Sequence, residues 1–341
     1  MPTGRSRPSR RPPPRPKRVE RDLSVPLERL SWKVGHDEAG LRLDLFLCAR
    51  LPWRSRNEVH GLIRGGLVTR NDEPLRRKAG HVVLGDAIVL HIPPPTEEAR
   101  HEALGRRLAD LVIFEDDDVL ALAKPAGLVV HPVGRTRVNT LIQGLHWLYR
   151  HGPRRTAFLP RICHRLDRDT SGVIVLAKSA AARIRLQEVF ETRDVEKSYE
   201  AVVAGLVERD EGLIDLPIGP DVDAEIHLMM TTRPDGLPSR TRFAVLERLR
   251  GTTLEATHMR FDIETGRQHQ IRVHAQAIGH PVLLDPLYAD GRQRWPDESP
   301  VIERQALHAR RTVLPHPRTG ERLVLEAPLP DDLRRLIEGL R

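Results

Sequence analysis

The chain has 341 residues, which is enough for two domains, or for one large and one small domain. Its net charge of +8 favours a polyanionic partner, and its aromatic content of only 4% predicts a core of aliphatic side chains. Two cysteines exclude a disulfide framework, and the absence of a long apolar run or a secretory signal predicts a soluble cytoplasmic protein without membrane contact.

Residues 1–30 open the chain with a basic, proline-rich segment, for which we expect no ordered structure. Residues 1–22 alone hold eight Arg or Lys against two acidic residues, together with six prolines. Such a segment cannot bury enough apolar surface to fold. It is either a solvated tail or an electrostatic arm that speeds association with nucleic acid.

Residues 31–92 are predicted to form a small domain. Apolar positions from Leu41 to Leu47 indicate a short helix, and Ser55 to Glu58 form a capping box for a second helix that Gly65-Gly66 ends. Strands are expected at 67–69 and 81–90, with a turn at 71–74 between them and a Gly-Asp turn at Gly85 within the second. The order of these segments resembles the RNA-binding domain named for the fourth small-subunit ribosomal protein. That resemblance implies that arginines on the polar positions bind RNA, here Arg54, Arg56 and Arg64.

Residues 93–110 start with three prolines and are interpreted as a linker, although residues 99–108 could form a short helix. Residues 111–341 are predicted to form the second domain. Its expected elements are a hairpin over 111–123, helices over 140–149 and after Ser179, a buried strand at 173–177, strands at 197–205, 241–246, 254–263, 303–309 and 311–326, and a last helix over 330–340.

A dense polar stretch over residues 161–172 directly precedes the buried strand. It holds Asp167 and Asp169 among three arginines, next to His164. A carboxylate beside an arginine stays ionised and can act as a nucleophile or as a general base without a cofactor. The alternative is a charged turn with no function beyond leading into a strand.

A second polar stretch, residues 266–274, is expected to begin a helix near Arg267 and His269, where free N–H groups and the helix dipole favour phosphate. A capped surface helix is the alternative. The sequence has no HExxH motif, no Cys/His cluster at ligand spacing and no glycine-rich phosphate loop. We therefore expect neither a metal nor a cofactor.

Five segments together resemble the RluA-type RNA pseudouridine synthases. They are Lys124–Pro132, His164–Gly172, Lys197–Tyr199, Gly266–His274 and Leu307–Ala309, and the resemblance covers about residues 39–330. It implies an α+β fold with a long, mixed, mainly antiparallel sheet, flanking helices and a central cleft. It also implies the reaction, in which a uridine in RNA is detached at its N-glycosidic bond, rotated and rejoined through C5.

The same resemblance assigns roles to individual residues. Asp167 matches the catalytic carboxylate, whether it attacks C1′ or removes a C2′ proton, and Tyr199 matches the tyrosine that packs on the target base. Arg272 matches the partner of the aspartate, and Arg165 matches the arginine that fills the space left by the flipped nucleotide. The remaining expected RNA contacts are His164, Arg168, Arg267 and His269. We expect Asp169 to be structural, paired with a neighbouring arginine or capping the turn.

Two positions depart from the family pattern. Ala123 stands where asparagine is usual, and Leu284 stands where glycine is usual before Asp285. We expect these departures to affect local loop geometry and not the reaction.

Two other functions remain open on the sequence alone. One is a non-catalytic RNA-binding or ribosome-assembly protein on the same fold, and the other is a hydrolytic RNA glycosylase that uses the same carboxylate. For an isomerase, large-subunit ribosomal RNA is the favoured substrate and tRNA is the alternative. We expect the protein to act as a monomer.

Overall fold

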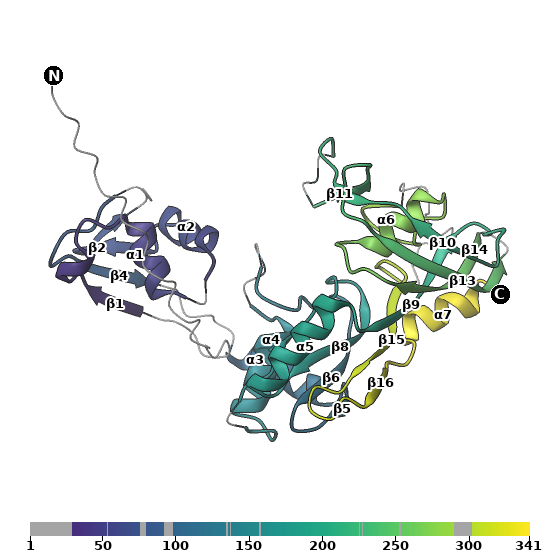
Figure 1. The fold of residues 1–341 in the computed structure, drawn as a ribbon, viewed down its shortest axis with the longest axis horizontal. Coiled ribbons are helices and arrows are strands. Elements are labelled where there is room, and N and C mark those ends of the chain that lie inside the picture. Colours follow the sequence, from purple (N-terminus) through teal and green to yellow (C-terminus); the bar gives the residue numbers. More distant parts are fainter. Residues whose placement is uncertain are drawn as a thin grey trace. The chain divides into compact units, whose positions relative to one another are not determined.

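The computed structural model describes residues 29–52, 54–75, 80–91, 98–133, 136, 138–156, 158–224, 226, 228–251, 254–289 and 302–341 (Figure 1). The chain forms two compact units, which divide between Thr96 and Glu97. We call them the N-terminal and the C-terminal unit. Nearly all of the expected tail, and the three prolines that open the expected linker, lie outside the described residues. No helix in the described ranges is long and apolar enough to span a bilayer.

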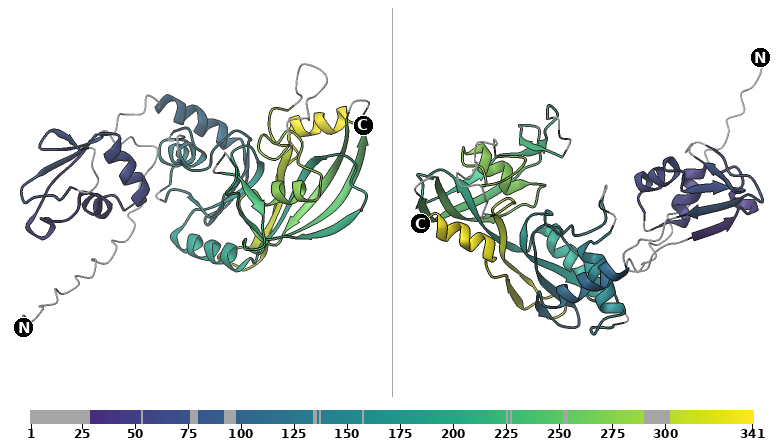
Figure 2. Two further views of the ribbon diagram at one scale, coloured as in Figure 1. Left: turned by 90° about the horizontal axis from the view of Figure 1, so that it is seen from above. Right: turned by 180° about the vertical axis from the view of Figure 1, so that it is seen from behind.

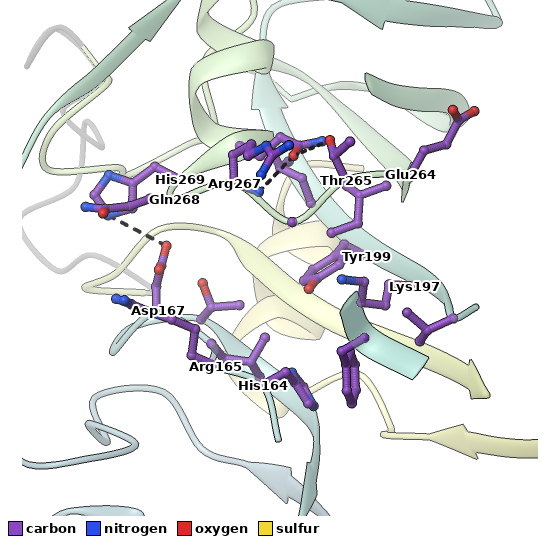
Figure 3. Close-up of a pocket in the computed structure, with 18 of the residues that line it drawn as sticks. His164, Arg165, Asp167, Lys197, Tyr199, Glu264, Thr265, Arg267, Gln268 and His269 are labelled. Atoms are coloured by element: carbon purple, nitrogen blue, oxygen red, sulfur yellow. Dashed lines mark hydrogen bonds and ion pairs between the residues drawn. The ribbon is translucent and has the colours of Figure 1, made fainter. Parts of the chain in front are cut away.

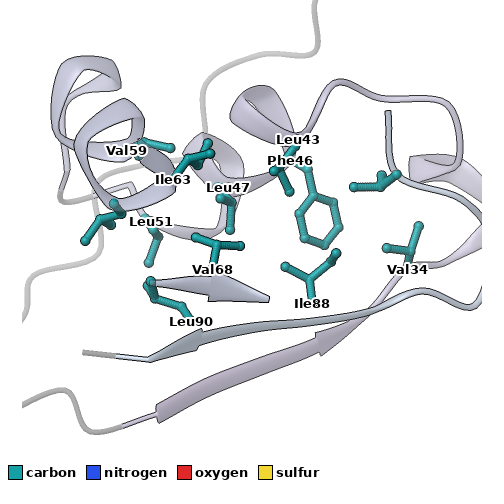
Figure 4. Close-up of a cluster of buried hydrophobic side chains, with 12 residues drawn as sticks. Val34, Leu43, Phe46, Leu47, Leu51, Val59, Ile63, Val68, Ile88 and Leu90 are labelled. Atoms are coloured by element: carbon teal, nitrogen blue, oxygen red, sulfur yellow. The ribbon is translucent and has the colours of Figure 1, made fainter. Parts of the chain in front are cut away.

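The N-terminal unit packs two helices on a four-stranded sheet of order β1-β4-β2-β3. Its elements are β1 (Arg29–Lys33), the 3-10 helix η1 (His36–Glu38), α1 (Leu43–Arg50), α2 (Arg56–Arg64), β2 (Val68–Arg70), β3 (Glu73–Leu75) and β4 (Ala87–His91). The helices bury Phe46, Leu47 and Ile63 against Val68 and Ile88 of the sheet (Figure 4). The expected capping box is present, because the Ser55 hydroxyl accepts a hydrogen bond from the Glu58 N–H.

Two expectations for this unit were wrong in detail. The expected Gly-Asp turn is present, since Gly85 has a φ of 86°, but only the residues after it form a strand, β4, whereas His81 makes just an isolated bridge with Arg42. The turn expected over 71–74 ends earlier, since only Asn71 and Asp72 have positive φ, and Glu73 already pairs with Arg70.

The C-terminal unit is built on a ten-stranded sheet whose main path runs β10-β13-β14-β9-β15-β8-β6-β5, with β16 on β15 and β7 on β8. Its strands are β5 (Val112–Glu115), β6 (Val119–Lys124), β7 (Arg161–Ile162), β8 (Ser171–Ala177), β9 (Glu196–Ala204), β10 (Glu211–Asp215), β13 (Arg240–Arg250), β14 (Glu255–Ile263), β15 (Leu307–Pro315) and β16 (Arg322–Glu326). A separate ribbon pairs β11 (Ile218–Pro220) with β12 (Met230–Thr232). All pairs on the sheet are antiparallel except β15 with β8, so the expected mixed, mainly antiparallel sheet is confirmed.

Five helices flank this sheet in the described part of the chain (Figures 1 and 2). They are α3 (Glu98–Ala109), α4 (Leu141–Arg150), α5 (Ala180–Thr192), α6 (Gln270–Ala277) and α7 (Asp331–Gly339). The helix α3 packs against α4 and belongs to the C-terminal unit. Residues 99–108, which the sequence allowed to be either linker or helix, are therefore helical. Ser179 caps α5 as expected, by accepting a hydrogen bond from the Ala182 N–H.

The end of the sheet differs from the sequence prediction. The two strands expected at 303–309 and 311–326 are in fact β15, which runs through the expected break at Arg310, and β16. The register shift between Ala309 and Arg311 is a bulge that β15 absorbs against β9 without ending. A bulge inserts one residue and reverses the side-chain alternation beyond it, which explains why the pattern suggested a break.

Gly172 makes the close approach of β8 and β15 possible. A Cβ at this position would lie 2.1 Å from the carbonyl oxygen of Ala309, and the φ of Gly172 is 118°. We expect Gly172→Ala to lower the free energy of unfolding by about 3 kcal/mol, because backbone would have to move in the middle of the sheet. Chemical denaturation measures this, with Gly339→Ala as the control, since nothing lies within 4 Å of that position. Equal stability of the two variants would contradict the prediction.

Candidate active site

The centre of the sheet brings together segments that are far apart in the sequence. The strands β8 and β15 run parallel and pair at Ser171 and His308, so both begin at the same edge. On the other side of β15, β9 runs antiparallel, so β9 begins and β14 ends beside the far end of β15, where Glu196 is opposite Val313. The loop before β8 folds back along β8, since His164 accepts a hydrogen bond from the Val175 N–H, and it meets the segment after β14 where Asp167 contacts Arg272. These are the two polar stretches that the sequence singled out.

A cavity of about 550 Å³ opens between these loops (Figure 3). Its walls come from the loop before β8, the end of α5, the start of β9 and the segment from β14 to α6. The candidate site residues that line it are His164, Arg165, Asp167, Tyr199, Arg267, His269 and Arg272. Seven candidates from three distant segments thus share one hollow.

Asp167 carries the carboxylate of this cavity. Its Oδ2 lies 3.3 Å from Nη1 of Arg272 and 3.9 Å from Nε2 of His269. The Asp167 side chain is 23% exposed, whereas that of Arg272 is only 4% exposed. The carboxylate is therefore held from one side and open to a ligand from the other.

Arg272 is held by a residue that the sequence analysis missed. Its Nε and Nη2 donate to the two carboxylate oxygens of Asp285 at 2.6 and 2.7 Å, and the Asp285 side chain is fully buried. This fork uses two donors of the guanidinium and leaves Nη1 directed at Asp167. Leu284 has a φ of 59° and directly precedes this anchor.

His269 completes the surroundings of Asp167. It is the N-cap of α6 with a φ of 55°, and its Nδ1 lies 2.8 Å from the hydroxyl of Tyr288. That hydroxyl already accepts a hydrogen bond from the Met230 N–H, so its proton is directed to Nδ1 of His269. Burial lowers the pKa of His269, against the influence of Asp167. The lowered pKa favours the neutral ring, whose Nε2 is the nitrogen nearer to Asp167.

Tyr199 contributes a buried phenol to the same cavity. It lies on β9 opposite Ala309 of β15 and is 9% exposed. Burial, and then the negative charge of Asp167, raise the pKa of Tyr199 well above its usual value. The hydroxyl stays protonated at neutral pH, so it can donate a hydrogen bond and its ring can pack on a base.

The arginines of the two loops differ in what they contact. Arg165 is exposed at the cavity and has no ion-pair partner within the described part of the chain. Arg168 lies outside the cavity lining and forms a fork with Asp169, with Nη2 to Oδ2 at 2.9 Å, so the expected structural role of Asp169 is confirmed. Arg267 is half-buried and donates from Nε to the Pro238 carbonyl at 3.3 Å.

Lys124 fastens the loop that carries Asp167, and the sequence analysis assigned it no role. Its Nζ is buried and donates to the carbonyls of Pro125, Leu128 and Arg168 at 2.9, 3.0 and 2.9 Å. All three donors of the ammonium are therefore used. The Arg168 carbonyl is one residue from Asp167, which ties the reactive loop to the end of β6.

His164 is oriented toward the sheet. Its Nε2 accepts a hydrogen bond from the Val175 N–H at 2.9 Å, and its ring packs on Phe190 at a centroid distance of 4.6 Å. Burial, and then the charge of Lys197, lower the pKa of His164 to about 3. A neutral ring in these contacts steadies the loop where it joins β8.

This burial predicts a pH dependence of stability. The folded-state pKa of His164 is about 3 against an ordinary value of 6.5, so the unfolded chain binds the extra proton. The contribution of His164 is complete above pH 6.5 and is lost as the pH falls towards the folded-state value. His164→Gln, whose amide oxygen can still accept from Val175, should make the fall in unfolding free energy between about pH 6.5 and pH 4 shallower. Exposed His151→Gln serves as the control and should keep the slope of the parent. Identical slopes for all three proteins would exclude this role.

The three candidate arginines of the N-terminal unit lie on or beside α2. Arg54 is half-buried, Arg64 is exposed, and Arg56 is 56% exposed, with Nη2 at 3.0 Å from Asp44. Asp44 is fully buried and also contacts Arg42 and His60. Burial raises the pKa of Asp44, but its hydrogen bonds to Arg42, His60 and Arg56 lower that pKa by more, so the carboxylate stays ionised.

No group of three or more metal-binding side chains gathers anywhere in the residues described.

Comparison with known proteins gives a consistent result. A family model described as RNA pseudouridylate synthase matches residues 118–277. A protein of Nitrosomonas europaea named ribosomal large subunit pseudouridine synthase D is 39% identical, over 89% of this chain and 85% of its own length. A protein of Pseudomonas aeruginosa with the same name is 37% identical, over 95% and 96%. The solved structure of human RNA pseudouridylate synthase domain containing 4 superposes with a TM-score of 0.56 at 26% identity, covering 72% of this chain and 98% of the human one.

Proposed function

Because the chain belongs to the RNA pseudouridine synthase family, we propose that it isomerises uridines of large-subunit ribosomal RNA and that Asp167 is its catalytic carboxylate. The observation that carries the proposal is the Asp167 carboxylate in an open cavity, beside the buried Arg272–Asp285 pair. The ribosomal substrate rests on the names of the relatives. A tRNA substrate is the alternative.

The proposed mechanism uses three side chains around the target uridine. Asp167 acts on the ribose, either as a nucleophile at C1′ or as a base at the C2′ proton, while the contact with Arg272 Nη1 holds it in position. The protonated Tyr199 packs against the base while it is detached and turned. Cleavage and rejoining balance without an oxidant, because C5 loses the proton that N1 gains.

Arg165 is proposed to replace the flipped base in the RNA. A nucleotide inside a helix or a folded loop must leave its stack before the cavity can accept it. The exposed Arg165 guanidinium is planar and can stack in the vacated place. We expect Arg165→Ala to reduce turnover on a structured hairpin about 10-fold or more, given the few kcal/mol that unstacking costs, and to affect a flexible single strand less. Equal losses on both RNAs in single-turnover assays would contradict this role.

The N-terminal unit is proposed to be an RNA-binding domain like that of the fourth small-subunit ribosomal protein. Its support is the pair of helices on a small sheet and the three arginines, Arg54, Arg56 and Arg64, at and beside α2. The ion pair of Arg56 with Asp44 occupies one of its donors and leaves others for phosphate. A cytoplasmic, monomeric enzyme is part of the same proposal.

Mapping of pseudouridine by chemical labelling tests the proposed function. Total RNA is compared from cells with the gene, without it, and with the gene carrying Asp167→Asn. We expect sites in large-subunit ribosomal RNA that are lost in the last two strains and restored by the parent gene. Sites lost only from tRNA would overturn the ribosomal assignment, and an unchanged map would overturn the function.

A further inference from the structure

A second hollow adjoins the cavity of the active site. Its volume is about 660 Å³. Both hollows are lined by Arg193, Val195, Lys197, Ile263 and Glu264, so these residues form the boundary between them. The second hollow extends from this boundary over the strands β9, β14 and β15. The two hollows therefore lie next to each other on the sheet.

Lys197 lies at this boundary with its ammonium group unmatched. It is two residues before Tyr199 on β9, so both side chains are on the same face of the strand and both line the active-site cavity (Figure 3). Within the described ranges its Nζ has neither a hydrogen-bond acceptor nor an ion-pair partner, and it lies 5.9 Å from the centroid of the Phe190 ring. Gly266 leaves room beside the ammonium, since a Cβ there would lie 3.3 Å from Nζ.

The surroundings of Lys197 are positive. Burial, and then the charge of Arg193, lower the pKa of Lys197. Arg193 itself ends α5 at a φ of 64°, is exposed and has no side-chain ion pair among the described residues. A half-buried ammonium next to a second cation is costly unless an anion joins them.

Most carboxylates around this boundary form ion pairs with residues other than Lys197 and Arg193. Glu264 pairs with Arg240 and Arg242, and Asp262 pairs with Arg260. On the strand itself, Glu196 pairs with Arg322, and Glu200 contacts His258 and Arg310. Glu191 also lines the cavity, but no ion pair joins it to Lys197 in the described chain. The arginines of the second hollow are therefore largely neutralised, whereas Lys197 and Arg193 are not.

We propose that Lys197 and Arg193 form a phosphodiester subsite, which holds the RNA backbone next to the target uridine and leads the strand from the active-site cavity into the second hollow. A phosphodiester supplies the anionic oxygens that both cations lack, and it is present at every nucleotide of the substrate class. The inference rests on the proposed function, because it needs RNA in the cavity. It adds a binding role for two residues to which neither the sequence analysis nor the comparisons assign one.

The salt dependence of RNA binding tests this subsite. The probe is a hairpin RNA that carries a uridine identified by the mapping experiment, and every variant is made in the full chain with Asp167→Asn, so that no turnover occurs. The logarithm of the association constant is plotted against the logarithm of salt concentration. Each lost contact with a single-stranded phosphate should make the slope shallower by about 0.7, so Lys197→Met should lose about 0.7 and Lys197→Met with Arg193→Gln about 1.4. Lys197→Arg should retain the parental slope.

Arg185→Gln is the matched control. It removes one positive charge from the exposed side of α5, where Arg185 pairs with Glu188 at 3.1 Å, and it lines neither hollow. Its slope should equal that of the parent. A slope for Lys197→Met equal to the parental slope would overturn the subsite, and a thermal melt of each variant confirms that the slopes compare folded proteins. If the unmodified enzyme converts no uridine in the mapping experiment, the proposed function fails instead, so the two failures are distinguishable.

Discussion

Asp167→Asn will reduce pseudouridine formation by at least about 10³-fold. The amide has nearly the shape of the carboxylate, but it is neither a nucleophile for C1′ nor a base for the C2′ proton. Its neighbours remain in place, because Arg272 keeps its fork to Asp285 and His269 keeps its hydrogen bond to Tyr288. The defect should therefore appear in the chemical step.

Single-turnover assays and RNA binding, measured on one hairpin, separate these effects. We expect the affinity of Asp167→Asn for RNA to stay within a few-fold of the parent. Asp169→Asn is the control, since Asp169 pairs with Arg168 outside the cavity and should retain most turnover. If Asp167→Asn retained turnover, the assignment of the carboxylate would be wrong.

Asp285→Asn will lower the free energy of unfolding by about 3–5 kcal/mol, the usual cost of removing one partner of a buried ion pair. The side chains of Arg272 and Asp285 are 4% and 0% exposed, so water cannot solvate the Arg272 charge that the substitution leaves unpaired. Without the fork to Asp285, the Arg272 guanidinium could turn, and its Nη1 would no longer be held toward Asp167. Turnover should fall together with stability.

Denaturant unfolding of the full chain measures this loss, and Asp235→Asn provides the contrast. Asp235 makes a similar fork with Arg233, but its side chain is 70% exposed. Water screens an exposed pair, so we expect Asp235→Asn to change the free energy of unfolding much less than Asp285→Asn. Equal losses for the two substitutions would show that burial of the Arg272 pair does not matter.

Much of the fold could be predicted because local signals agree with it. The run after Gly172 is apolar and β-branched, and β8 is buried along its whole length. The cap at Ser179 and the acidic turn between β5 and β6 are likewise local features of the sequence. The elements that were misplaced depend on pairing. The bulge in β15 has meaning only against β9, and the residues before the Gly-Asp turn form no strand, because the one pairing there is an isolated bridge between His81 and Arg42.

The candidate site shows the same division. Motif resemblance brought Asp167, Tyr199 and Arg272 together, and the chain folds them into one cavity. Asp285 was noticed only as the neighbour of an unusual Leu284, since nothing local shows that an aspartate will be buried against a particular arginine. Its signal was its position as the single acidic residue in the stretch 280–288. Lys197 was missed for the opposite reason, because an unmatched charge is visible only when its neighbours are known.

The mass of the product tests the central claim most directly. The purified chain is incubated with a hairpin RNA that carries a mapped uridine, and the RNA is then analysed by mass spectrometry and by pseudouridine-specific labelling. Isomerisation predicts a labelled nucleotide at that position in RNA of unchanged mass, and Asp167→Asn should give no label. Loss of the uracil mass without label would make the chain a hydrolytic glycosylase, and unlabelled RNA of unchanged mass would leave it a binding protein.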